Sequence, residues 1–275
     1  MATETVRSKD GTTIAFSRAG SGPALIVVDG ALCHRQFGPA GPLAEQLAPY
    51  FTVFTYDRRG RGESGNTLPY AVEREVEDLD ALIRAAGGSA FVVGISSGAA
   101  LALEAANRGL AISKVALYEA PFIVDGTRTP IGEDYLPQLE HLIAEGRRGA
   151  AVKLFMKAVQ VPAIGIFMMQ LMPAWKKLKA VAPTLVHDIT IVERYQRGKA
   201  LPADRWSAVK QPTLVMDGGK SPEWMRNAQR ALAHVVPGAK TQTLEGQTHM
   251  VKAEILAPAI VEFFTEKSVA AAPGR

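Results

Sequence analysis

Short apolar runs recur along the chain, separated by longer segments in which apolar and polar positions follow a helical spacing. The runs are rich in β-branched and aromatic residues, which is typical of strands buried on both faces of a sheet. The clearest runs are Ala24–Gly30, Phe51–Asp57, Ala90–Ser96, Lys114–Ala120 and Pro212–Gly218. Apolar residues from Val72 to Ile83 recur at three- and four-residue steps, which predicts a helix with one apolar face. Alternating strands and helices predict a parallel sheet covered on both sides.

This alternation has a different start and one long interruption. Asp10 and Gly11 lie between two extended-looking stretches, a pattern typical of a hairpin, so we expect the sheet to begin antiparallel. After Ala120, helical patterns follow one another for about ninety residues, which is too long for an ordinary loop in a compact domain. We therefore expect a core formed by residues 1–121 and 206–275, and an inserted helical cap at residues 122–205.

Composition and charge narrow the classes of protein. Of the 275 residues, 47% are hydrophobic and 21% are charged, which suits one large folded domain, alone or with an insertion. The net charge is +4, but the Lys and Arg residues form no long basic run, so no nucleic-acid partner is predicted. The single cysteine, Cys33, and an opening stretch without a secretory pattern predict a cytoplasmic protein.

One uncharged stretch, Val159–Trp175, contains two prolines, a glycine and two glutamines. It is slightly shorter than the roughly 20 residues of a membrane span, so we interpret it as a buried or ligand-facing segment and predict no membrane span. Phe167, Met168 and Met172 give it a flexible apolar surface that could line a pocket for apolar substrates. Packing within the core of the cap is an equally good interpretation.

Two adjacent serines follow a predicted strand and precede an Ala-rich helical segment. The pentapeptide from Gly94 to Gly98 fits the G-x-S-x-G pattern, a strand-to-helix turn so sharp that the central residue is strained and its neighbours must be small. Ser96 is the central residue, and the amide of Ser97 could point at a developing oxyanion. The alternative is a chance pattern in which the serine only caps the helix. The strand and helix on either side favour a nucleophilic serine.

A general base for this serine is predicted near the end of the chain. His249 follows the last candidate strand, Lys240–Leu244, and precedes a final amphipathic helix. Serine before histidine in chain order is the arrangement in which a loop brings the base to a serine at a nucleophile elbow.

These motifs resemble those of the α/β-hydrolase superfamily, particularly its capped esterase, haloperoxidase and haloalkane-dehalogenase-like branch. The matching segments are VVDGA, YDRRGRGESG, GISSGA and GQTHMV. The resemblance implies a mostly parallel eight-stranded sheet with helices on both faces and an inserted helical cap. It also implies Ser96 as nucleophile, His249 as base, and the amides of Ala31 and Ser97 as oxyanion donors. Asp29 stands where the family usually has His, but backbone amides are sufficient to form the oxyanion hole.

Further pocket residues are expected beside these motifs. Cys33 and His34 lie just beyond the oxyanion loop, where packing or ligand contact is a better interpretation than catalysis because His249 already supplies the base. Phe122 follows the strand that ends at Ala120. We expect all three to line the substrate pocket together with the side chains from the uncharged stretch.

The chain departs from the family at the third member of the triad. The usual acid lies a few residues after the strand Pro212–Gly218, and this chain has Ser221 there. Glu119 is the first candidate to replace it, since some haloalkane dehalogenases place their acid after the preceding strand. Asp217 is the second candidate. Glu223 is a distant third, because its place in the first turn of a helix is explained by the helix dipole.

An alternative role for Glu119 is a pocket wall or a structural hydrogen bond.

Taken together, the motifs lead to the hypothesis of a serine hydrolase that cleaves a carboxylic ester, lactone or thioester of a fairly apolar small molecule. No metal-ligand spacing or glycine-rich phosphate loop is found, so neither a metal nor a cofactor is predicted. The alternatives are a non-hydrolytic reaction, such as carbon–carbon cleavage or cyclisation, and a ligand-binding protein on the same fold.

Overall fold

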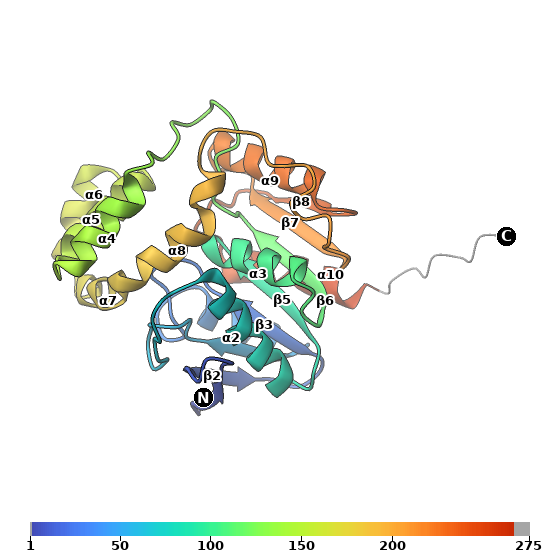
Figure 1. Cartoon of the computed structure of the whole chain (residues 1–275). Coiled ribbons are helices and arrows are strands. Elements are labelled where there is room, and N and C mark those ends of the chain that lie inside the picture. Colours follow the sequence, from blue (N-terminus) through green and yellow to red (C-terminus); the bar gives the residue numbers. More distant parts are fainter. Residues whose placement is uncertain (1, 267–275) are drawn as a thin grey trace.

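The computed structural model describes residues 2–266 and contains one eight-stranded sheet (Figure 1). The spatial order of the strands is β1-β2-β4-β3-β5-β6-β7-β8. Strand β2 runs antiparallel to both of its neighbours, and the other pairs are parallel. The strands are β1 (Glu4–Arg7), β2 (Thr13–Ala19), β3 (Ala24–Val28), β4 (Thr52–Tyr56), β5 (Ala90–Ile95), β6 (Ile112–Tyr118), β7 (Thr213–Gly218) and β8 (Lys240–Leu244). The predicted mostly parallel sheet is confirmed, as is the antiparallel hairpin at its start.

The central strands supply two apolar cores, one on each face of the sheet. In β3, Ile26 and Val28 pack into one core while Leu25 and Val27 pack into the other, because successive side chains of a strand point to opposite faces. Helices α2 (Val72–Ala85), α3 (Ser97–Asn107) and α9 (Glu223–Val235) cover the first face. Helices α1 (Ala40–Leu47) and α10 (Ala253–Thr265) cover the second. The predicted burial on both faces is therefore confirmed.

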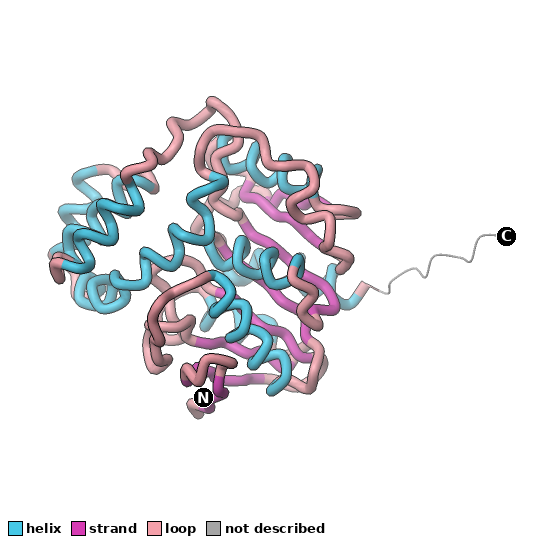
Figure 2. The backbone as a smooth tube through the Cα atoms, in the orientation of Figure 1, coloured by secondary structure: helices cyan, strands magenta, loops and turns pink. Residues whose placement is uncertain are grey.

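The segment between β6 and β7 is helical, and we call its helices α4–α8 the helical insertion. They are α4 (Tyr135–Ala144), α5 (Arg148–Ala158), α6 (Ala163–Gln170), α7 (Ala174–Val181) and α8 (Leu185–Val192). Figure 2 shows α4–α7 gathered to one side of the sheet, with α8 leading back towards it. The insertion has an apolar core of its own, which also takes in Leu32 from the loop after β3. The domain boundaries at residues 122 and 206 stay a prediction, and residues 267–275 of the predicted core lie outside the described part.

Candidate active site

The turn between β5 and α3 has the strained geometry expected of a nucleophile elbow. Ser96 has φ +58° and ψ −126°, a backbone conformation that non-glycine residues rarely adopt. A Cβ on Gly98 would lie 2.2 Å from the Val28 carbonyl oxygen, and one on Gly94 would lie 2.4 Å from the Gly98 carbonyl oxygen. Both flanking positions therefore require glycine. The Ser96 hydroxyl makes no capping hydrogen bond to α3, so helix capping does not explain the serine.

His249 joins this serine to a carboxylate. It lies in the loop between β8 and α10, and its Nε2 atom is 3.1 Å from the Ser96 Oγ atom. Its Nδ1 atom is 2.8 Å from Oε2 of Glu119. The structure thus brings together the predicted nucleophile, the predicted base and the first-ranked acid in one continuous chain of contacts.

Glu119 is held firmly at the end of β6. Its side chain is fully buried, and its second carboxylate oxygen, Oε1, accepts a hydrogen bond from the amide of Gly218 at 2.8 Å. Its backbone has φ +48°, a second strained residue beside the elbow. Because both oxygens have partners, the carboxylate has a fixed direction towards His249.

The other candidate acids have different surroundings. Asp217 lies within β7, opposite Thr243 of β8, and no contact joins it to His249 in the described structure. Burial raises the pKa of its carboxyl above the usual value. Glu223 is the first residue of α9. Ser221, at the position of the usual acid, has a buried hydroxyl for which the described residues offer no hydrogen-bond partner.

The predicted oxyanion donors flank the serine. A Cβ on Gly30 would lie 2.9 Å from the Ser96 Cβ atom, so the loop that carries Ala31 presses directly against the elbow. Ser97 begins α3, where the first amides of a helix have no partner in the helix itself. Among the described residues, neither the Ala31 nor the Ser97 amide donates to a protein acceptor. Both are therefore available to a ligand oxygen.

Asp29, immediately before this loop, is a buried carboxyl. Neither of its oxygens has a hydrogen-bond partner within the described part of the chain. Burial raises the pKa of the carboxyl to about 7, although the guanidinium groups of Arg61 and Arg58 act in the opposite direction. The residue that replaces the family's histidine is therefore an acid that titrates near neutral pH.

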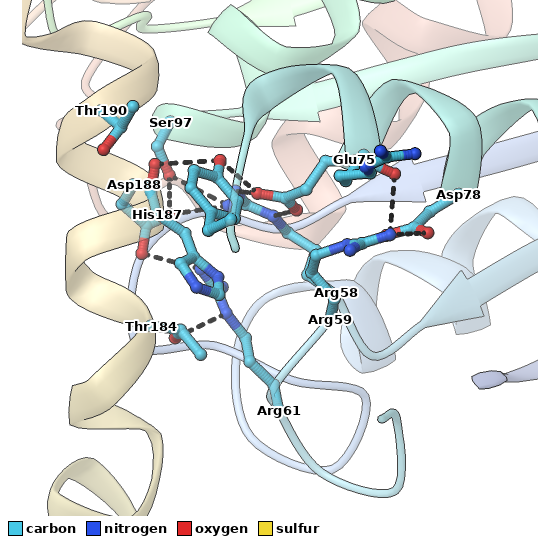
Figure 3. Close-up of polar contacts among 12 residues, drawn as sticks. Arg58, Arg59, Arg61, Glu75, Asp78, Ser97, Thr184, His187, Asp188 and Thr190 are labelled. Carbon is cyan, nitrogen blue, oxygen red and sulfur yellow. Dashed lines mark hydrogen bonds and ion pairs between the residues drawn. The ribbon is translucent and has the colours of Figure 1, made fainter. Parts of the chain in front are cut away.

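A buried ionic network connects the helical insertion to the elbow (Figure 3). Asp188 of α8 accepts a hydrogen bond from the Ser97 hydroxyl at 2.7 Å. The same carboxylate pairs with Arg58 and with Arg61, each at 2.7 Å. Glu75 of α2 binds the other side of the Arg58 guanidinium through two hydrogen bonds of 2.7 and 2.6 Å. All of these side chains are buried, so their charges are compensated within the network.

The two arginines also hold the oxyanion loop. Arg61 Nη1 donates to the Gly30 carbonyl at 2.6 Å and to the Cys33 carbonyl at 3.1 Å. Arg58 Nη1 donates to the Asp29 carbonyl at 3.3 Å. One carboxylate in the insertion thus orients two guanidinium groups, which in turn fix the loop that carries the Ala31 amide.

Sequence reasoning assigned no chemical role to Arg58, which it placed in a mainly structural turn, and it missed Asp188. A signal was present: Asp188 lies three residues after Leu185 and four before Val192, on the apolar face of its helix. A carboxylate inside an apolar stripe needs a buried partner. Nothing nearby in the sequence identified that partner.

The expected pocket residues have different surroundings in the structure. Cys33 and His34 lie beside the oxyanion loop, and burial raises the pKa of the Cys33 thiol to about 12. Phe122 is buried, and its ring packs against two other aromatic rings, Tyr195 and Trp206. Contact of these residues with a substrate stays a prediction.

The uncharged stretch Val159–Trp175 has a surface location. The side chains of Phe167, Met168 and Met172 are more than half exposed. The predicted buried segment is therefore wrong for most of its large apolar side chains, although Ile166 is buried. The reason is that α6 packs mainly against two helices of the insertion, α5 and α7, which leave these side chains uncovered. The ligand-facing interpretation stays a prediction. None of the described helices is both long and apolar enough to cross a membrane.

Comparison with known proteins defines the family. The sequence pattern of the alpha/beta hydrolase family matches residues 20–255, and the chain belongs to this family. The crystal structure of an alpha/beta hydrolase from Sphaerobacter thermophilus is 51% identical, with a TM-score of 0.88; the similarity covers 95% of this chain and 100% of that one. The resemblance seen in the motifs is therefore confirmed, and the chain is a member of a hydrolase family.

More distant relatives have hydrolytic names. N-formylmaleamate deformylase from Pseudomonas putida is 34% identical over 116 residues, which are 40% of this chain and 41% of the deformylase. The match thus spans less than half of that relative's length. The enol-lactonase from Burkholderia xenovorans has a TM-score of 0.71, covering 96% of this chain and 100% of its own, at 20% identity. That similarity shows the fold alone.

Proposed function

We propose that this protein is a serine hydrolase that cleaves a carboxylic ester, lactone or thioester through an acyl-enzyme on Ser96. The observation that carries the proposal is the chain of contacts from Glu119 through His249 to Ser96, at 2.8 and 3.1 Å. A nucleophile, a base within hydrogen-bond reach and a third group that orients the base are the recognised parts of such a site.

The proposed mechanism begins with the imidazole. Glu119 accepts a hydrogen bond from Nδ1–H of His249, which leaves Nε2 free to take the hydroxyl proton of Ser96 as its oxygen attacks the carbonyl carbon. The amides of Ala31 and Ser97 stabilise the oxyanion. The imidazolium then gives its proton to the leaving group, and a water molecule, activated by the same imidazole, releases the acyl group.

The surroundings of the site favour an apolar substrate. Leu32, next to the oxyanion donor Ala31, packs into the apolar core of the helical insertion. The buried guanidinium groups that bind the oxyanion loop, those of Arg58 and Arg61, are paired with carboxylates and are not free to bind an acidic substrate. We therefore propose that the substrate is a small, uncharged and fairly apolar acyl compound. We also propose that the reaction uses no cofactor. The hydrolytic name of the partial deformylase relative is consistent with attack on a carbonyl carbon.

The test is covalent labelling with a fluorophosphonate, followed by peptide mapping. The expected result is one adduct, on Ser96, with loss of activity towards p-nitrophenyl butyrate. The Ser96→Ala variant is the matched control, and it should be neither labelled nor active. A wild-type protein that is neither labelled nor esterolytic would reject the proposal and favour a non-hydrolytic reaction or ligand binding in the same site.

A further inference from the structure

The helical insertion exposes a cluster of large apolar side chains. Of the ten large hydrophobic residues that are exposed in the described chain, six lie between residues 159 and 172. We call these six the apolar tip: Val159, Ile164, Phe167, Met168, Leu171 and Met172. Their exposed fractions range from 45% to 69%. Single exposed apolar residues are ordinary, but a cluster of this kind marks an interaction surface.

Basic residues flank the apolar tip along the sequence, with no acidic residue among them. Residues 146–187 contain seven Lys or Arg residues and no Asp or Glu, although the whole chain has 31 basic and 27 acidic residues. The rest of the chain therefore has more acidic than basic residues. The seven are Arg147, Arg148, Lys153, Lys157, Lys176, Lys177 and Lys179. The positive charge of this protein is concentrated on one part of the fold.

Five of these cations share one groove. A groove of about 860 Å³ between the start of α5 and α7 is lined by Arg147, Arg148, Lys153, Lys176 and Lys179. Gln170, the last residue of α6, also lines it, so the cationic groove adjoins the helix that carries Ile164, Phe167 and Met168 of the apolar tip. Of the five, only Arg147 pairs with a carboxylate among the described residues, at 3.1 Å from Glu145. The groove thus presents largely uncompensated positive charge to solvent.

We propose that the apolar tip and the cationic groove together bind an anionic lipid surface. Apolar side chains such as Ile164 and Leu171 would enter the boundary between headgroups and acyl chains, while the groove binds the lipid phosphates. Exposed apolar residues next to a cluster of Lys and Arg are the combination by which proteins lie on a membrane without crossing it. This inference is independent of the proposed hydrolytic function.

A second copy of this chain is a less suitable partner. Two copies joined through their apolar tips would bring two sets of uncompensated cations together, and like charges at an interface are costly. An anionic surface supplies the opposite charge over the whole area. The position of the apolar tip also suits docking, because α6 packs mainly against α5 and α7 and lies away from the sheet (Figure 1).

The experiment is co-sedimentation of the full-length protein with vesicles. One set contains phosphatidylcholine alone, and the other contains equal amounts of phosphatidylcholine and phosphatidylglycerol. The expected result is binding to the anionic vesicles only. Raising the salt from about 50 mM to about 500 mM should weaken that binding ~tenfold or more, because screening shortens the reach of the charges. Inorganic phosphate at a few millimolar should compete only weakly.

Two pairs of variants separate the apolar and electrostatic contributions. The double variant Lys153→Glu with Lys176→Glu should lose binding, whereas Lys199→Glu with Lys210→Glu, which changes the net charge equally on exposed sites outside helices α4–α8, should retain it. The double variant Ile164→Ser with Leu171→Ser should also lose binding. Tyr50→Ser changes an exposed aromatic residue that is distant from the apolar tip in the sequence, and this variant should retain binding. Thermal unfolding of every variant checks that the fold is intact.

Several outcomes would overturn the proposal. They are equal binding to both kinds of vesicle, no binding by the wild type, and binding by the tip and groove variants that matches their controls. A wild-type dimer in solution that dissociates on the double change Ile164→Ser with Leu171→Ser would instead identify the apolar tip as a self-association surface. If inorganic phosphate at a few millimolar released the protein from the anionic vesicles, the groove would instead be a binding site for a small anion.

Discussion

The carboxylate of Asp188 lies 2.7 Å from the hydroxyl of Ser97, although the two residues are 91 positions apart in the chain. Ser97 carries one of the two proposed oxyanion donors, and Asp188 belongs to the helical insertion. The same carboxylate holds Arg58 and Arg61, which bind the carbonyls of the oxyanion loop. The geometry of the proposed oxyanion hole therefore depends on a residue of the insertion.

Asp188→Asn should lower both stability and catalysis. Arg61 would lose its carboxylate partner, and an uncompensated buried charge costs about 3 to 5 kcal/mol. In the fraction that remains folded, kcat should fall more than KM rises, because an oxyanion hole acts on the transition state. The measurement combines urea denaturation with steady-state kinetics below the unfolding transition. Glu193→Gln, a change of the same kind on a partly exposed residue, is the control. A stability loss with unaltered kcat would leave Asp188 a purely structural role.

Ser96→Ala should abolish ester hydrolysis while leaving the protein folded. Alanine keeps the Cβ atom at the strained elbow and removes only the hydroxyl. Loss of the nucleophile should cost on the order of 10⁶ in kcat. Initial rates with p-nitrophenyl butyrate, on protein purified beside the wild type, provide the measurement. Near wild-type turnover by the variant, with contaminating esterase excluded, would refute the acyl-enzyme mechanism.

Glu119→Gln should be far more harmful than Asp217→Asn. The amide keeps the shape of Glu119 but cannot fix the same imidazole tautomer, so kcat should fall by as much as ~10⁴. Asp217 makes no contact with His249 in the described structure, and its amide variant should retain most of the activity. Both kcat values are compared on the same ester. The reverse order would transfer the role of the acid to Asp217.

Asp29→Asn should change how stability depends on pH. Burial raises the pKa of this carboxyl from 3.8 to about 7, so between these pH values the folded state holds a proton that the unfolded state has released. The stabilisation that comes from this bound proton is complete below the pKa of the carboxyl in the unfolded state, and it is lost as the pH rises through about 7. The amide cannot ionise, so it does not lose this stability. As the pH rises towards about 7, the free energy of unfolding of Asp29→Asn relative to the wild type should therefore increase by up to about 1.4 kcal/mol per pH unit.

Urea denaturation of both proteins at about pH 5 and about pH 8 measures this difference. Asp204→Asn, at an exposed aspartate, is the control and should show no such trend. A difference in unfolding free energy between Asp29→Asn and wild type that is the same at both pH values would contradict the assigned protonation.

The local features of this protein were predictable from its sequence. Apolar runs such as Ala24–Gly30 predicted strands buried on both faces, and the structure confirms them. The pattern from Gly94 to Gly98 predicted a strained turn at Ser96, which has φ +58°. These predictions succeed because strand burial and backbone strain arise from the residues themselves and their nearest neighbours in the chain.

Only the tertiary structure decided which distant side chains meet. The sequence ranked Glu119 ahead of Asp217 as the partner of His249, but Glu119 and the histidine are 130 positions apart, and only the packing of the strand ends brings them to 2.8 Å. The partners of Asp188 were not predicted, since they depend on how α8 docks against the sheet. The exposure of α6 was likewise decided by the packing of the insertion, because an apolar composition gives no information about which neighbours are available to cover it.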